Sequence, residues 1–344
     1  MKILITGNMG YIGPIVVSHL KRTIPNAQLV GYDMGYFATR LTSNILPEVQ
    51  LDRQVFGDVR KIKKELLCGI EAVVYLAAIS NDPMGEAFSK ATLDINYHST
   101  IEWAKAAKHA GVKRFIFASS CSVYGFSEEG ICDENSPLHP LTAYAKSKLL
   151  SEQELKPLAG TDFAVTCFRF ATACGMSPRL RLDLVLNDFA AAALLSQKIA
   201  ILSDGSPWRP LINVHDMARA IEWGIRRKPE IGGAYLVVNA GSHSWNYQIK
   251  ELARAVSSVI PSEVCIAQNS QPDKRSYRVN FDLFKRLAPD FQPKYDLTTT
   301  VEELIVGMKQ TAIPKDFRNS SLIRLNALSK LKEYRLVNEN LEWN

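Results

Sequence analysis

The sequence predicts an α/β fold in which a doubly wound parallel sheet carries a smaller, mixed C-terminal lobe. Over about the first 120 residues, short β-branched runs alternate with amphipathic segments, a pattern typical of βαβ units with parallel strands. Helices cover both faces of such a sheet. Beyond residue 161 the alternation becomes irregular, which favours a second lobe built onto the sheet.

Periodicity places the individual elements. In the first expected helix, Ile12, Val16 and Leu20 recur at helical spacing. The expected strands are residues 2–6, 28–32, 53–56, 72–76, 114–118, 163–168, 199–202 and 234–239. The expected helices are residues 12–22, 87–110, 182–197 and 217–226. The last stretch, 319–344, carries leucines near helical spacing, and we expect a packing appendage without chemistry of its own.

Composition sets broad limits on the class of protein. With 344 residues, 47% of them hydrophobic, the chain can bury a full core without a metal or disulfides. Its 41 Lys and Arg against 35 Asp and Glu leave a net charge of +6, which favours an anionic ligand without requiring one. The six cysteines form no C-x-x-C pair, so we expect a reducing compartment and no metal site. No secretory leader or long apolar run is evident, which predicts a soluble, cytoplasmic protein that binds neither membrane nor nucleic acid.

A glycine motif follows the first expected strand and opens the first expected helix. Gly7, Gly10 and Gly13 allow a tight turn, close approach of the backbone to a pyrophosphate, and close packing of helix on strand. The helix N-terminus then faces the phosphate charge. A lone motif of this kind is often an ordinary turn, but the strand and helix around it favour a dinucleotide site that includes Tyr11 and Ile12.

An acidic residue at the end of the second expected strand completes this pattern. Asp33 lies 20 residues beyond Gly13, where a carboxylate accepts hydrogen bonds from the ribose hydroxyls and repels a 2′-phosphate. The residues directly after it are uncharged, so no cation is expected beside it. We therefore predict NAD as the cofactor. Asp58 and Val59 are expected at the adenine, although Asp58 alone is more often a helix cap.

Tyr144 and Lys148 lie four residues apart at the start of another expected helix, so their side chains share one face. A phenol has a pKa near 10, but a nearby ammonium and an oxidised nicotinamide both favour the phenolate. Tyr144 can then take a hydroxyl proton while hydride leaves the same carbon. A Tyr-x-x-x-Lys pair alone is common by chance, and the dinucleotide motif upstream is what gives it weight.

These motifs resemble the extended short-chain dehydrogenase/reductase superfamily, whose Rossmann-type domain has the spacing Gly-x-x-Gly-x-x-Gly. The segment Phe117–Gly125 resembles the Ser-Ser-x-x-Val-Tyr-Gly of its nucleotide-sugar epimerases and dehydratases. The resemblance implies that Ser120 is the catalytic hydroxyl that holds the alkoxide or ketone oxygen. Ser119 and Ser122 are then structural, although an alignment shifted by one residue would exchange the roles.

The resemblance also implies a domain division and further cofactor contacts. Residues 1–170 would form the NAD-binding Rossmann domain and 171–344 mainly the substrate lobe, with segments of about 199–240 returning to the first domain. Leu76, Ala77 and Ala78 would line the cofactor, and Asn96 matches the family's structural Asn.

Substrate residues follow from the same resemblance. The element Asp204–Asp216 resembles the family's Asp-Gly-x-x-x-Arg-x-x-x-x-Val-x-Asp, whose arginine binds the nucleotide diphosphate. This implies the role for Arg209 and, from the segment 272–277, a second contact for Arg275. The implied substrate residues are Ser80, Ser120, Cys121, Ser122, Thr172, Asn187, Arg209 and Arg275. For Asn187, a helix-interior residue with structural bonds only is the alternative.

The expected reaction follows from two positions. Sugar 4,6-dehydratases carry Asp-Glu where this chain has Cys121 and Ser122, so loss of water is disfavoured. The chain also resembles the UDP-glucose 4-epimerases, which implies an NAD-dependent nucleotide-sugar epimerase acting at carbon 4. The alternatives are a nucleotide-sugar reductase or dehydrogenase, a dehydratase, and a non-catalytic NAD-binding module.

The resemblance finally implies a homodimer. Helices 87–110 and 141–155 would pack against their symmetry mates as a four-helix bundle. Ile95, Ile101, Leu149 and Leu150 are expected to supply apolar contacts there.

Overall fold

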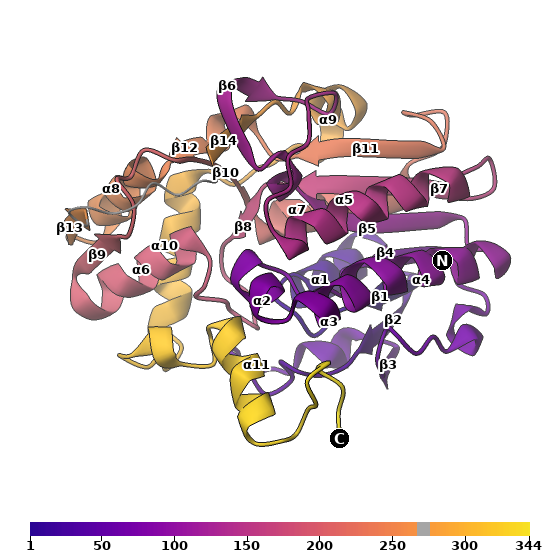
Figure 1. Cartoon of the computed structure of the whole chain (residues 1–344), viewed down its shortest axis with the longest axis horizontal. Coiled ribbons are helices and arrows are strands. Elements are labelled where there is room, and N and C mark those ends of the chain that lie inside the picture. The colour runs from indigo at the N-terminus through magenta and orange to yellow at the C-terminus, as the bar shows by residue number, and fades with distance from the viewer. Residues whose placement is uncertain (267–275) are drawn as a thin grey trace.

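A computed structural model of the chain describes residues 1–266 and 276–344, apart from the side chains of residues 127–129. Its centre is a seven-stranded parallel sheet of order β11-β7-β5-β4-β1-β2-β3 (Figure 1). The strand order reverses beside β1, as expected for a doubly wound sheet, so the predicted fold class is confirmed. The strands are β1 (Lys2–Thr6), β2 (Gln28–Asp33), β3 (Arg53–Phe56), β4 (Ala72–Tyr75), β5 (Arg114–Ser120), β7 (Ala164–Phe170) and β11 (Tyr235–Ala240).

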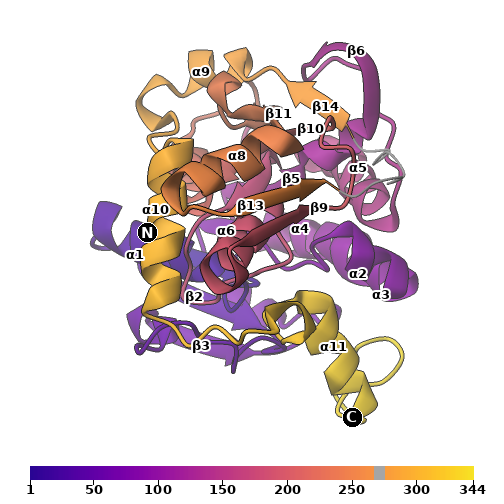
Figure 2. The ribbon, with the colours of Figure 1, turned by 90° about the vertical axis from the view of Figure 1, so that its left-hand side faces the viewer.

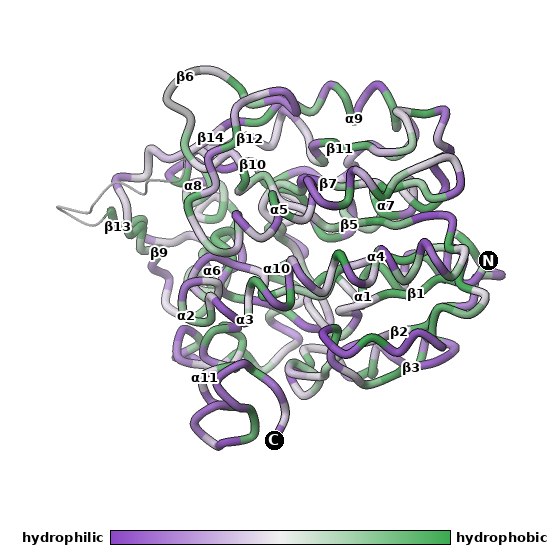
Figure 3. Tube along the Cα trace, turned by 45° about the vertical axis from the view of Figure 1, so that its right-hand side comes forward, coloured by the Kyte–Doolittle hydropathy of each residue, from purple (hydrophilic) through white to green (hydrophobic). Residues whose placement is uncertain are grey.

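Helices cover both faces of this sheet. The helices α1 (Gly13–Thr23) and α7 (Val214–Arg226) contact each other on one face, and α4 (Ser99–His109) and α5 (Ala143–Leu155) lie together on the other (Figure 1). Trp103 of α4 is completely buried against the sheet. Hydrophobic stretches run along β1 and β5 in Figure 3, because strands covered on both faces are apolar throughout.

The expected helix 87–110 is interrupted. The chain instead forms α2 (Asp82–Ala87), α3 (Ser89–Leu93), a π-helical turn η3 (Asp94–His98) and then α4. Asn96 in that turn is fully buried: its amide accepts a hydrogen bond from Ile79 N–H at 2.8 Å and donates one to the Ile79 carbonyl at 2.9 Å. The wider π-helical turn places Asn96 against the loop after β4. The hydrophobic periodicity of the sequence does not reveal this turn.

The second lobe combines small sheets with helices. Figure 2 shows α6 and α8 beside β9 and β13, and α10 packs on these two helices. The strand β11 returns to the large sheet by pairing with β7, while the division at residue 170 stays a prediction. The elements of this part of the chain are β6 (Phe126–Cys132), β8 (Thr172–Cys174), α6 (Val185–Ser196), β9 (Lys198–Ile201), β10 (Trp208–Asn213), β12 (Asn246–Gln248), α8 (Ile249–Val259), β13 (Glu263–Ile266), β14 (Ser276–Val279), α9 (Asp282–Leu287) and α10 (Leu297–Lys309).

The C-terminal segment forms α11 (Arg324–Glu333) and then lies against the loop after β2 (Figure 1, yellow). The hydroxyl of Tyr36 donates a hydrogen bond to the carbonyl of Leu341, and the indole of Trp343 donates one to the carbonyl of Met34 at 2.8 Å. The expected appendage is therefore anchored on the loop that leaves the second strand of the sheet.

Two of the four residues expected at a dimer interface cannot lie there as predicted. Ile95 and Ile101 belong to the core of their own chain, with 5% and 6% of their surface exposed. Helical spacing identifies an apolar face but not which partner covers it. Leu150 and Leu141 are 36% and 48% exposed, and the homodimer stays a prediction. Among the described residues, no helix combines the length and apolarity needed to cross a bilayer.

Candidate active site

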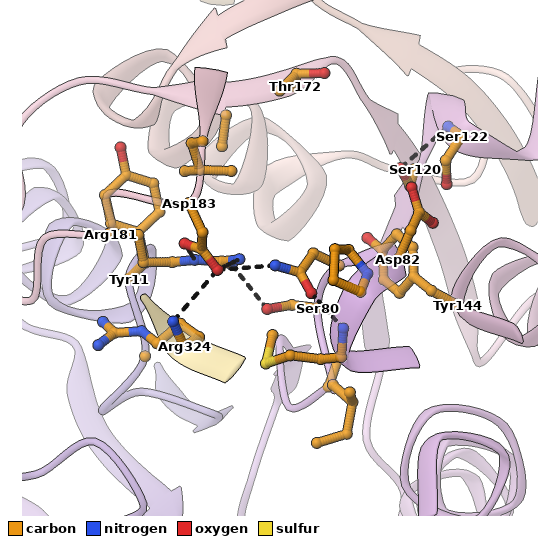
Figure 4. Close-up of a pocket in the computed structure, with 18 of the residues that line it drawn as sticks. Tyr11, Ser80, Asp82, Ser120, Ser122, Tyr144, Thr172, Arg181, Asp183 and Arg324 are labelled. Carbon is orange, nitrogen blue, oxygen red and sulfur yellow. Dashed lines mark hydrogen bonds and ion pairs between the residues drawn. The ribbon is translucent and has the colours of Figure 1, made fainter. Parts of the chain in front are cut away.

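A cavity of about 900 Å³ opens at the carboxyl ends of the central strands (Figure 4). Five described residues of its wall directly follow strands of the sheet: Gly7, Met34, Gly57, Leu76 and Ala171. The second lobe and α11 close the other sides. Ligands of doubly wound proteins bind at this position, outside the point where the strand order reverses.

The glycine-rich turn forms a cradle that fits a dinucleotide. Gly7 has φ +73°, and a Cβ there would lie 2.6 Å from the Ala77 nitrogen. At Gly13 a Cβ would lie 2.2 Å from the Asn8 carbonyl oxygen. No described side chain caps the N-terminus of α1, and its first turn contains no acidic residue. Its backbone N–H groups therefore suit a pyrophosphate.

Asp33 lies in the cavity wall at the end of β2. Its carboxylate accepts hydrogen bonds from Met9 N–H at 3.0 Å and Gly35 N–H at 2.7 Å. Burial raises the pKa of Asp33, while these two bonds and the guanidinium of Arg179 lower it. The expectation that no cation lies near Asp33 was wrong, because Arg179 comes from a loop of the second lobe that packs against the segment after β2. Arg179 is itself paired with Glu48 at 2.6 Å.

Most of the other predicted cofactor residues line the cavity, and one lies behind its wall. Tyr11, Ile12, Val59, Leu76, Ala77 and Ala78 line the cavity, as do Gly10 and Gly13. Asp58 also lines it, but its carboxylate forms an ion pair with Arg60 at 2.7 Å. Asn96 does not line the cavity. Its amide is hydrogen-bonded to the backbone of Ile79, which does line it.

The three predicted catalytic residues meet on one side of the cavity. Ser120 ends β5, and Tyr144 and Lys148 lie one turn apart on α5. The Ser120 hydroxyl is hydrogen-bonded to Tyr144 and accepts the Ser122 N–H at 3.1 Å. The Lys148 ammonium donates to the Ala118 carbonyl at 2.7 Å and lies 5.7 Å from the centre of the Tyr144 ring.

The electrostatics at Tyr144 differ from the expectation. Burial raises its pKa to about 12, the bond with Ser120 lowers it, Asp82 raises it and Arg181 lowers it. Burial lowers the pKa of Lys148 to about 7, against the attraction of Glu152. Sequence reasoning missed both Asp82 and Arg181, which no local motif identifies. Figure 4 shows Asp82 beside Tyr144 and Ser120.

Two neighbours of Ser120, Ser119 and Cys121, are bonded to other partners. The Ser119 hydroxyl donates to the carboxylate of Glu152 at 2.5 Å, so only Ser120 of this pair is directed to Tyr144. Ser122 lines the cavity, whereas the thiol of Cys121 is buried against the Arg169 carbonyl at 3.2 Å. The expected substrate contact of Cys121 is therefore not formed, because the tight turn after β5 directs its side chain into the core.

A polar network crosses the cavity from β4 to the second lobe (Figure 4). Arg181 donates to the Ser80 hydroxyl at 2.8 Å and forms a two-pronged ion pair with Asp183 at 2.9 and 3.0 Å. Asp183 also accepts a hydrogen bond from Asn81 at 2.8 Å. A guanidinium from the second lobe therefore lies beside Ser80.

The remaining predicted substrate residues have different environments. Thr172 and Arg209 line the cavity, and Arg209 is 8% exposed, with its guanidinium 5.9 Å from the Tyr277 ring centre. Asn187 is completely buried and binds Gly175 N–H, the Tyr11 hydroxyl and the Arg181 carbonyl. These are structural bonds, in agreement with the alternative for a helix-interior Asn. Arg275 lies outside the described residues.

Comparisons with known proteins agree with this geometry. The chain is 26% identical over 316 residues to a putative UDP-glucose 4-epimerase of Methanocaldococcus jannaschii, covering 89% of this chain and 98% of the relative. A dTDP-glucose 4,6-dehydratase of Streptomyces niveus is 27% identical over 64% of this chain and 68% of its own. The structure of MoeE5 in complex with UDP-glucose and NAD superposes with a TM-score of 0.77 at 25% identity, covering 90% of this chain and 99% of MoeE5.

The model of one protein family matches residues 3–241, more than half of the chain. The match includes the glycine-rich turn, Asp33 and the predicted catalytic residues Ser120, Tyr144 and Lys148. It confirms NAD as the cofactor and the predicted resemblance to extended short-chain dehydrogenases/reductases. The chain belongs to the NAD dependent epimerase/dehydratase family.

Proposed function

We propose that this protein is a nucleotide-sugar epimerase that inverts carbon 4 through a transient 4-keto sugar. The observation that carries the proposal is the convergence of Ser120, Tyr144 and Lys148 on the cavity that the glycine-rich turn also lines. Arg209 on the far lobe lines the same cavity, so a diphosphate there would direct its sugar toward Tyr144. Several relatives, among them the protein of Methanocaldococcus jannaschii, are named as UDP-glucose 4-epimerases, which supports the same reaction.

The protein residues supply acid–base chemistry and orientation. Tyr144 as phenolate takes the proton of the sugar hydroxyl and later returns it, while Ser120 hydrogen-bonds the sugar oxygen in both states. The glycine-rich turn and Asp33 would hold NAD, which would supply the reversible hydride transfer at that carbon. Inversion requires the keto sugar to turn over in the cavity between the two transfers, so that hydride reaches its opposite face.

The charges around Tyr144 change its pKa and therefore the pH at which it can act as a base. Burial and the bond with Ser120 have the largest effects on this pKa. Next come Asp82, which raises it, and Arg181, which lowers it. Arg181 is held in place by Ser80 and Asp183. We therefore assign Arg181 as a positioning residue that lowers the pKa of Tyr144 and so offsets part of the effect of burial.

Dehydration is the second candidate, and Asp82 favours it. Cys121 and Ser122 provide no carboxylic acid beside the reacting sugar, but Asp82 lines the cavity close to Tyr144. Its carboxylate accepts a hydrogen bond from the Thr142 hydroxyl at 2.6 Å, which fixes the position of the carboxylate.

A labelling experiment separates the two reactions. UDP-, GDP-, CDP- and dTDP-hexoses are incubated with the enzyme in deuterated water, and the products are returned to ordinary water before mass spectrometry. Epimerisation passes a hydride to NAD and back without contact with solvent, so the expected product is a diastereomer of unchanged mass. Carbon-bound deuterium or the loss of one water molecule would contradict the proposal. Oxidation of added NADH by a keto sugar, without epimerisation, would support the reductase instead.

Substitution of the base tests the catalytic assignment. Tyr144→Phe removes the proton acceptor but keeps the ring, and we expect kcat to fall by about 100- to 10,000-fold. NAD affinity, measured by calorimetry, should stay close to that of the wild type. Turnover at the wild-type rate would remove Tyr144 from the mechanism.

The two charges at Tyr144 predict opposite changes in the pH dependence. Arg181→Gln raises the pKa of the phenol, so the acidic limb of the kcat/KM profile should move to higher pH. Asp82→Asn lowers that pKa and should move the limb to lower pH. Arg181→Lys keeps the charge and is the matched control, expected near the wild-type profile. If the first two variants both keep the wild-type limb, these charges do not act on the base.

Arg209 is expected to bind the diphosphate of the substrate. Arg209→Ala should weaken binding of the tightest nucleotide sugar from the panel above by about 1.5–3 kcal/mol, or roughly 10- to 150-fold, because a buried charged hydrogen bond is lost. Arg254→Ala, on the exposed side of α8, is the control and should bind as the wild type. Equal affinities for all three proteins would exclude the assignment.

A further inference from the structure

Arg324, the first residue of α11, has an unusual environment for a buried cation. Only 1% of its surface is exposed, yet its Nη1 has no hydrogen-bond partner among the described residues. Its Nη2 donates to the Arg179 carbonyl at 2.8 Å, and its guanidinium lies 4.4 Å from the centre of the Phe37 ring. Its closest carboxylate contact is through the backbone, with its N–H 3.4 Å from Asp183.

The neighbouring charges do not neutralise the positive charge of Arg324. Burial lowers the pKa of Arg324 to about 9, with further lowering by Arg181, Arg179 and Arg40 against the attraction of Asp183. Asp183 and Glu48 are already committed to Arg181 and Arg179 in two-pronged pairs. A buried cation without a partner is strongly destabilising, so this arrangement is suited to an anion from outside the chain.

The position of Arg324 indicates which anion. Arg324 lines the same cavity as the glycine-rich turn, and Phe37 beneath it belongs to the loop after β2. That loop follows Asp33, whose carboxylate is bonded to Met9 of the turn. Figure 4 places Arg324 on the side of Tyr11, away from Tyr144 and Ser120. The part of a dinucleotide that lies between its adenosine and its nicotinamide is the pyrophosphate.

We propose that Arg324 is a cofactor-binding residue whose free Nη1 donates a hydrogen bond to the pyrophosphate of NAD. The N-terminus of α1 binds this group from the other side, so that backbone dipoles and one guanidinium share its charge. The C-terminal segment is then part of the cofactor site rather than a packing appendage. Its further bonds to Met34 and Tyr36 hold it to the loop beside the adenosine.

The test measures cofactor binding and does not depend on the reaction. NAD-free protein is titrated with NAD and ADP-ribose by calorimetry, and with adenosine by NMR. Arg324→Met removes the charge but keeps an apolar stem over Phe37, and we expect affinity for NAD and ADP-ribose to fall about 10- to 100-fold. Adenosine, which lacks the pyrophosphate, should bind as before. Arg324→Lys should recover part of the loss, because lysine keeps the charge but not the planar fork.

A matched control comes from the same helix. Lys330→Ala removes an exposed cation from α11, and its NAD affinity should equal that of the wild type. If Arg324→Met does not fold, Arg324→Lys alone should still bind NAD several-fold more weakly than the wild type, with adenosine unchanged.

Three results would overturn the proposal. Wild-type NAD affinity in the Arg324 variants would exclude the contact. An equal loss for NAD and adenosine would assign Arg324 a structural role only. If NAD affinity is unchanged but a nucleotide sugar binds more weakly, Arg324 binds the diphosphate of the substrate instead. Because turnover is not measured, none of these results bears on the proposed epimerisation.

Discussion

The hydroxyl of Tyr11 connects the glycine-rich turn to the second lobe, and the shape of the cavity depends on this contact. It donates a hydrogen bond to the Gly175 carbonyl at 2.6 Å and accepts one from the Asn187 amide at 3.0 Å. The Ser177 hydroxyl binds the backbone carbonyl of Tyr11 at 2.6 Å. Burial raises the pKa of Tyr11 well above its ordinary value, so the phenol stays a donor at any physiological pH. The turn that carries the cofactor is thereby held at one distance from the lobe that is expected to carry the sugar.

Buried ion pairs complete the walls that this contact positions. Arg179 with Glu48 joins the second lobe directly to the first. The Arg181–Asp183 pair lies within the second lobe and reaches the first through Ser80 and Asn81. Removing water from such charges costs about as much as their attraction returns, so they contribute more to a unique arrangement than to stability. Among the described residues, three buried arginines line the cavity: Arg181, Arg209 and Arg324. Guanidinium groups in fixed positions suit a dinucleotide and a nucleotide sugar, each of which carries a pyrophosphate.

Prediction from the sequence succeeded where the information is local. The strand, glycine turn, helix and Asp33 follow one another along the chain, and Tyr144 and Lys148 share a helix face by spacing alone. It failed where a side chain is directed by distant residues: Cys121 turns into the core, and Ile95 and Ile101 are covered by their own chain. The cation near Asp33 could not be predicted either, since Arg179 is 146 positions away in the sequence.

The sequence by itself determined the class of fold and the glycine-rich turn, and it named the three residues that stay the predicted catalytic group, because periodicity and short motifs encode backbone geometry directly. Only the tertiary structure decided the electrostatics of that site. Asp82, Arg181 and Arg324 approach the cavity from α2, the second lobe and the C-terminal helix, and none belongs to a motif. The effect of a charge depends on its distance and on how much water is excluded, and both quantities exist only once segments far apart in the chain have packed together.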